Sequence, residues 1–252
     1  MNDTCSCAAE MRIIRRLLGV LDEGLTTVPM GLHTNLTNPT WMAVPAAAVA
    51  RCRALLDGMA TLLTEEHGLL LGALLRPLYE VWLTGFYSLL GGLDAIEVLL
   101  DARDIRLRPL RRAFQLPDDP SLPSGKHLSV RKLAERVHEL AATQRDLAPF
   151  FDALRLYDAL YALDSYDSVH GGLGVIGRHL LASTDAENPD YSIVLKPAVG
   201  GMGCQRLTFA GLLTIDLARP VWRLGGIGDD ALERLDADLR AANHNTFYGP
   251  TA

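Results

Sequence analysis

Apolar side chains recur every three or four residues along most of the chain, which is the period of an amphipathic helix. Near the start, Met11, Ile14, Leu17, Leu18 and Leu21 fall on one side of a helical wheel and arginines on the other. The segments that such patterns predict as helices are residues 8–25, 46–64, 65–90, 94–112, 129–147, 150–181, 204–219 and 229–243. We therefore predict an all-α fold, a single-domain bundle of about seven helices.

Clusters of proline, glycine and polar residues separate these helices. Residues 26–45 and 116–126 each carry three prolines and are predicted as a loop and a linker. The run at 191–195 is strand-like, but one short strand does not form a sheet. The chain is divided by this pattern into an N-terminal helix and loop, a core bundle, and C-terminal helices packing on the same core: residues 1–45, 46–182 and 183–252.

The helix at 65–90 is the most apolar of the chain, yet it holds Arg76, Pro77 and Glu80 in its middle. Arg76 and Glu80 are four residues apart, so their side chains can bond to each other on one face. Pro77 removes a backbone donor and predicts a kink at that point. A kink beside a buried ion pair indicates either a binding site or a structural pair that holds the bundle in register.

The same two charges decide whether this helix crosses a membrane. They divide it into two uncharged halves, and neither half reaches the roughly 20 residues that a span requires. A charge at the centre of a bilayer is also costly. We therefore predict no membrane span, and a buried core helix whose large side chains are packed: Trp82, Phe86 and Leu89.

A second polar pattern lies at 162–180. Asp164, Asp167 and His170 step by three and share one face of the predicted helix, and glycines continue that face. A glycine inside a helix costs up to about 1 kcal/mol relative to alanine, and it is tolerated where another backbone comes close. The simplest such partner is the stripe of the apolar helix that carries the ion pair.

We therefore predict one buried polar cluster of Arg76, Glu80, Asp167 and His170, which are also the candidate catalytic residues. The alternative is that His170 only caps or packs at a bend. The RPLYE segment at 76–80 and the later Ser-x-His-Gly-Gly segment at 168–172 resemble a family of uncharacterised bacterial all-helical proteins, a domain of unknown function. The resemblance covers roughly residues 55–181. It implies an all-helical fold and no established activity.

Two catalytic patterns remain open. The HEPN ribonucleases, small helical bundles, use an arginine and a histidine separated by four to six residues, and Arg131 and His138 fit that spacing. Chance supplies such a pair in a chain with 21 arginines and seven histidines. The ferritin-like dimetal oxidases use acid-x-x-histidine pairs from two helices.

Two acid-x-x-histidine pairs are present in this chain, Glu135 with His138 and Asp167 with His170. Bridging carboxylates would come from Glu80 and from Asp152 or Asp158, and the cofactor would be a divalent metal such as iron. Arg76, one turn from Glu80, disfavours this reading because it would repel a dication.

Composition and net charge disfavour some classes of function. The 252 residues are 49% hydrophobic with a net charge of −6, which disfavours a general nucleic-acid coating protein. The arginines at 103–112 could contact phosphates, although a solvated helix end explains them as well. Four cysteines are too few for a disulfide framework, so we predict free thiols in a cytoplasmic protein: Cys5, Cys7, Cys52 and Cys204.

The sequence does not disclose a reaction. It has neither a phosphate-binding glycine loop after a strand nor a Gly-x-Ser-x-Gly elbow, which excludes a P-loop kinase and an α/β-hydrolase. We predict a cytoplasmic helical binding or regulatory protein whose polar cluster is structural or holds a small-molecule ligand. The sequence is also compatible with a homo-oligomer. The alternatives are an HEPN-like ribonuclease or defence protein that binds nucleic acid, and a ferritin-like dimetal oxidase.

Overall fold

The structure is a computed structural model of the chain, and it describes residues 7–27, 42–64, 71–113, 128–162, 180–185, 188–195 and 203–248. The elements in chain order are α1 (Ala8–Thr27), α2 (Ala43–Thr64), α3 (Leu71–Ala113), α4 (Val130–Thr143), α5 (Ala153–Leu156), the π-helix η3 (Tyr157–Ala162), β1 (Leu180–Asp185), β2 (Asn188–Leu195), α7 (Gly203–Leu224) and α8 (Asp230–Tyr248). Helices form nearly all of the described chain, so the predicted all-α bundle is confirmed.

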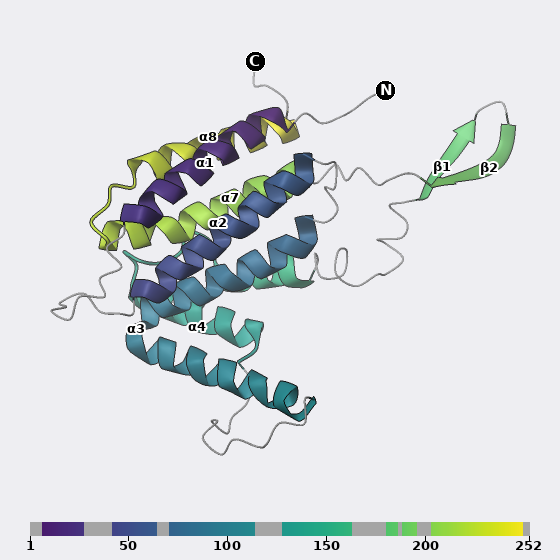
Figure 1. The fold of residues 1–252 in the computed structure, drawn as a ribbon. Coiled ribbons are helices and arrows are strands. Elements are labelled where there is room, and N and C mark those ends of the chain that lie inside the picture. Colours follow the sequence, from purple (N-terminus) through teal and green to yellow (C-terminus); the bar gives the residue numbers. More distant parts are fainter. Residues whose placement is uncertain are drawn as a thin grey trace.

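Helix α7 is the centre of the bundle. It contacts α1, α2, α3 and α8, and Figure 1 shows it running between the α1–α8 pair and the α2–α3 pair. A helix surrounded in this way must be apolar on nearly all sides. Leu207, Leu213, Leu217 and Val221 are fully buried, and Trp222 is nearly so. The core therefore draws on all three predicted segments of the chain.

Glycines allow the helices to come close at two places. A Cβ at Gly85 of α3 would lie 2.7 Å from a Leu217 methyl and 3.0 Å from the Cβ of Ala48, so α2, α3 and α7 meet there. A Cβ at Gly24 of α1 would collide with the ring of Trp222. Larger side chains at either position would push the helices apart.

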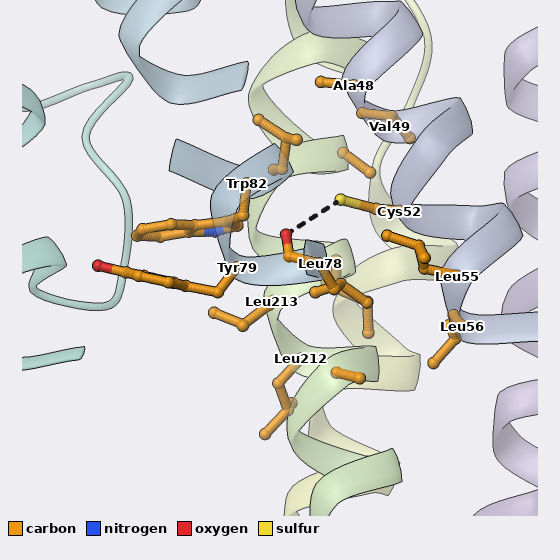
Figure 2. Packing of buried hydrophobic residues seen from close by; sticks show 14 of the residues in the cluster. Ala48, Val49, Cys52, Leu55, Leu56, Leu78, Tyr79, Trp82, Leu212 and Leu213 are labelled. Carbon is orange, nitrogen blue, oxygen red and sulfur yellow. Dashed lines mark hydrogen bonds between the residues drawn. The ribbon is translucent and has the colours of Figure 1, made fainter. Parts of the chain in front are cut away.

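Helix α3 is buried over its first half, as predicted. Trp82 and Phe86 are fully buried, and Leu89 is 3% exposed. Figure 2 shows the Trp82 ring beside the ring of Tyr79, also of α3, with aliphatic side chains of α2 and α7 in the same cluster. The thiol of Cys52 in α2 donates to the Leu78 carbonyl of α3 at 3.9 Å. By length and composition alone, 71–103 could cross a membrane, but a buried core helix meets the same criteria. The structure is thus compatible with the absence of a membrane span.

The break in α3 lies at Gly92, where the backbone adopts φ 60° and ψ −141°. Positive φ is readily adopted by glycine, because glycine has no Cβ to clash. The side chain of Gln144, at the end of α4, donates to the Leu90 carbonyl at 2.6 Å and so satisfies a carbonyl beside the break. The predicted end at Gly91-Gly92 is confirmed, but the chain resumes as a helix at once. The non-helical angles are at Gly92 and not at Pro77.

The predicted helix at 150–181 is wrong at both of its ends. Asp152 accepts a hydrogen bond from Arg155 N at 2.9 Å, so it is the N-cap and α5 begins at Ala153. At the other end, Leu180 and Leu181 belong to β1, which pairs antiparallel with β2. The strand predicted at 191–195 is confirmed but begins at Asn188, and its pairing with β1 shows that the expectation of an unpaired strand was wrong.

The prediction of free cysteines is wrong for Cys7 and Cys204, which form a disulfide with Cα atoms 5.5 Å apart. They are separated by 197 residues, and the fold brings them together because the starts of α1 and α7 lie side by side. The distance between the two cysteines along the sequence does not indicate that they are close in space. Cys52 is a free, buried thiol, as predicted, and burial raises the pKa of that thiol. Cys5 lies outside the described residues.

Candidate functional site: a polar network between α3, α5 and α7

The predicted ion pair forms on α3 but is not buried. Arg76 Nε lies 3.3 Å from Glu80 Oε1, and their side chains are 28% and 37% exposed. Trp82, two residues after Glu80 and therefore on nearly the opposite side of α3, is fully buried. The prediction of a buried Arg–Glu pair is therefore corrected to a half-exposed one. The helical spacing could show that the two side chains meet, but not how much protein covers them.

The other two members of the predicted cluster, Asp167 and His170, lie outside the described residues. Whether they join Arg76 and Glu80 stays a prediction. Tyr87, which continues the stripe toward the C-terminal end of α3, does contact another helix. Its hydroxyl accepts a hydrogen bond from Arg136 of α4 at 2.7 Å, and the guanidinium lies 5.7 Å from the centre of the ring.

A carboxylate that the sequence analysis missed lies between α3 and α7. Asp216 Oδ1 accepts from the backbone N–H of Phe150 at 2.8 Å, and Oδ2 accepts from Trp82 Nε1 at 3.3 Å. The backbone N–H of Phe151 also bonds to it. Its partners are thus neutral donors, one from the core of α3 and two from the segment before α5.

This environment raises the pKa of Asp216 to about 7. The main cause is burial, which removes the solvation that the charged form needs, and the nearby carboxylate of Asp236 raises it further. The three donors act in the opposite direction but do not outweigh burial. A carboxyl group with this pKa changes its protonation around neutral pH, which is a property required of an acid–base group.

The segment at 150–153 is held on its other side by α3 and α4. Tyr79 Oη donates to the Ala153 carbonyl at 2.8 Å, and His138 Nδ1 of α4 lies 3.1 Å from Asp152 Oδ2. The hydrogen bond from Arg155 N, followed by the nearby His138, holds the pKa of Asp152 below its usual value, whereas burial raises the pKa of Tyr79. One short segment therefore receives polar contacts from α3, α4 and α7.

Aromatic rings surround the point where this segment meets α7 and α8. Phe150 is 72% exposed, and its ring is covered by the guanidinium of Arg240, which lies 4.5 Å from the ring centre. Arg240 is held by two hydrogen bonds to Asp236, of 2.7 and 3.1 Å. Phe151 packs edge-on against Phe209 of α7, with 5.5 Å between ring centres. The backbone groups that bond to Asp216 therefore lie beside one exposed aromatic ring, that of Phe150.

The predicted metal-ligating residues that the structure describes each pair with a different side chain and do not face one common site. Glu80 pairs with Arg76, Glu135 pairs with Arg131 at 3.2 Å, and His138 faces Asp152. No group of three or more metal-ligating side chains occurs within the described part of the chain. The remaining ligands of the predicted dimetal site, Asp167 and His170, fall in 163–179, which the structure does not describe.

Asp216 could have been found by the reasoning applied to Glu80. The residues from Leu207 to Trp222 contain a single acid in an otherwise apolar helix, LTFAGLLTIDLARPVW. A lone carboxyl group in such a run requires donors, whatever their origin. The sequence could not name those donors, because two of them are backbone groups from residues 65 or more positions away.

Comparison with known proteins found no relative of this chain. No family model, no curated protein and no solved structure matches this chain. The resemblance to a family of uncharacterised bacterial helical proteins therefore stays a prediction.

Proposed function

We propose that the protein is a cytoplasmic helical binding or regulatory protein and that the Arg76–Glu80 stripe of α3 holds a small polar ligand. The observation that carries this proposal is the partly exposed ion pair on the first half of α3, which is otherwise largely buried. A pair that served only the core would be fully covered, whereas side chains 28% and 37% exposed can be reached from solvent. Asp167 and His170 remain the predicted further members of this site.

A guanidinium attracts anions such as carboxylates and phosphates, and it binds them with directed hydrogen bonds. The ligand class that Arg76 favours is therefore a small anion, and Glu80 would exchange its present contact for an amine or hydroxyl of that ligand.

A thermal-shift panel of inorganic phosphate, pyrophosphate, mononucleotides and small dicarboxylates tests the proposal. We expect at least one compound to raise the melting temperature of the wild type and to lose this effect in Arg76→Met. Arg53 is a control with similar exposure, since its side chain is 27% exposed and pairs at i,i+4 with Asp57 at 3.0 Å. Arg53 also bonds Asp22 of α1 at 2.9 Å, so each variant's shift is measured against its own melting temperature without ligand. Arg53→Met should keep the shift. A panel without any shift, or equal loss in both variants, contradicts the proposal.

One observation favours a second function, the HEPN-like ribonuclease. His138 and Asp152 lie 3.1 Å apart and are 49% and 36% exposed, so the imidazole is both oriented by a carboxylate and open to solvent. Such a histidine suits acid–base catalysis. Arg131 lies two turns earlier on α4, where it pairs with Glu135.

RNA cleavage by the purified protein separates the two functions. A ribonuclease should lose activity in His138→Gln and in Arg131→Gln, while Asp152→Asn should reduce the rate and change its pH profile. Arg76→Met should have no effect on cleavage. Cleavage that survives His138→Gln would show a contaminating nuclease or a different site.

A further inference from the structure

The part of α3 that follows Gly92 carries an exposed apolar stripe. Leu93 and Leu100 are 55% and 45% exposed and lie seven residues apart, which is two helical turns, so they share one face. Ala95 and Ala102, on the other side, are 2% and 8% exposed and face the protein. Figure 1 shows this half of α3 at the edge of the molecule, with α4 as its neighbour.

Such exposure is uncommon in this protein. Within the described residues, four large apolar side chains are largely exposed, and two of them belong to this stripe: Leu93, Leu100, Phe150 and Leu224. Single exposed apolar residues are normal on a protein surface. Two on the same helical face, with the partly buried Ile96 between them, form a stripe of the kind that pairs helices.

The charges on the same helix are separated along its length. Asp94, Glu97 and Asp101, all exposed, come in its first part. The second part carries five arginines and one acid, Asp104, so it is mainly basic: Arg103, Arg106, Arg108, Arg111 and Arg112. This order suits the helix dipole, so the charges by themselves do not require a partner. They do determine which partner fits the stripe.

We propose that the protein forms a homodimer in which the second half of α3, residues 93–113, packs antiparallel against the same helix of a second copy. A two-fold axis then places the acidic part of each helix beside the arginine-rich part of the other. A parallel arrangement would place acids against acids and arginines against arginines, which costs free energy. Leu93 and Leu100 would be covered by the partner.

Sedimentation velocity and light scattering over a range of protein concentrations test the dimer. We expect the wild type to associate, and Leu100→Glu to weaken the association by about tenfold or more, because it places a charge in the centre of the interface. Leu224→Glu is the matched control, since Leu224 is 40% exposed on α7 and lies outside the stripe. It should associate like the wild type. Circular dichroism shows whether each variant stays folded, and Leu93→Ser replaces Leu100→Glu if the latter unfolds.

Charge exchange tests the pairing of the helices. A chain with Glu97→Arg and Asp101→Arg has a largely basic helix that keeps Asp94 and Asp104, and a chain with Arg103→Glu and Arg106→Glu has a largely acidic one. Each should be monomeric alone, and an equimolar mixture should form a heterodimer. A wild type that stays monomeric at all concentrations overturns the proposal. A dimer that Leu100→Glu or the charge changes leave intact also overturns it, because the interface would lie elsewhere.

Discussion

Two acidic residues stand in two of the most apolar helices of the protein, and their surroundings differ. Glu80 of α3 has an opposite charge one turn away and lies partly in solvent. Asp216 of α7 lies between helices, and its partners are the neutral donors of Trp82 and the segment at 150–151. Neutral donors satisfy the hydrogen bonds of a carboxylate but supply no charge. Burial therefore prevails at Asp216 and raises its pKa to about 7.

The comparison separates two uses of a polar group in an apolar helix. At Glu80, the acid marks a place where the core helix reaches the surface, and a ligand can reach it. At Asp216, the acid connects α7 to a loop segment and to the centre of α3. The first arrangement contributes little to stability, whereas the second holds three parts of the chain together. The following predictions test that difference, beginning with the largest effect.

Trp82→Ala should have the largest effect. The ring is fully buried, packs against Phe86 with 5.0 Å between ring centres, and donates to Asp216. Its loss should lower the free energy of unfolding by about 3–5 kcal/mol, as for other large-to-small core changes. Urea denaturation measures this. Trp82→Phe keeps most of the packing and loses the donor, so it should cost about 1–3 kcal/mol. Equal costs for both variants would mean that the hydrogen bond dominates over packing.

The pKa of Asp216 should make stability depend on pH. Its folded-state pKa of about 7 exceeds the ordinary value of 3.8, so the native state binds the proton more tightly. The stabilising contribution is full below about pH 4 and is lost as the pH rises through about 7. Melting temperatures measured from pH 4 to 8 should therefore fall more steeply for the wild type than for Asp216→Asn. Parallel curves for the two proteins would disprove the raised pKa.

Tyr79→Phe tests the other side of the segment at 150–153. The change removes the hydrogen bond to the Ala153 carbonyl and little else, so it should lower the free energy of unfolding by about 1 kcal/mol. Hydrogen exchange gives a more local measurement. The amide of Phe150, held by Asp216, should exchange faster in this variant. Unchanged exchange there would show that the bond from Phe150 to Asp216 does not depend on Tyr79.

Arg76→Met should have the smallest effect on stability. A buried pair would cost roughly 3–5 kcal/mol when one partner is removed. A half-exposed pair should cost less than about 1 kcal/mol, because water solvates the remaining carboxylate. Urea denaturation of Arg76→Met and of the double variant with Glu80→Leu measures the coupling. A cost of several kcal/mol, recovered in the double variant, would show that Arg76 is an anchor of the core, and the contrast with Asp216 would be lost.

Much of the helical arrangement followed from local patterns. The period of apolar residues predicted α1, α2, α4, α7 and α8 to within about five residues of their bounds. The segment predicted from residue 129 begins there because Ser129 is the N-cap of α4. The Gly91-Gly92 pair marked the break in α3. The predictions that failed concern both ends of the segment at 150–181, the pairing of Cys7 with Cys204 and the burial of the Arg76–Glu80 pair. Each of these depends on a contact with a distant part of the chain.

The sequence by itself determined which residues are helical, which faces are apolar, and that Arg76 and Glu80 meet, because these follow from spacing along one helix. Only the tertiary structure decided that this pair is half-exposed, that Asp216 receives donors from Trp82 and Phe150, and that burial raises its pKa. Exposure and solvation are set by all the elements that surround a group. Donors from positions 66 and 134 residues away leave no periodic signal in the chain.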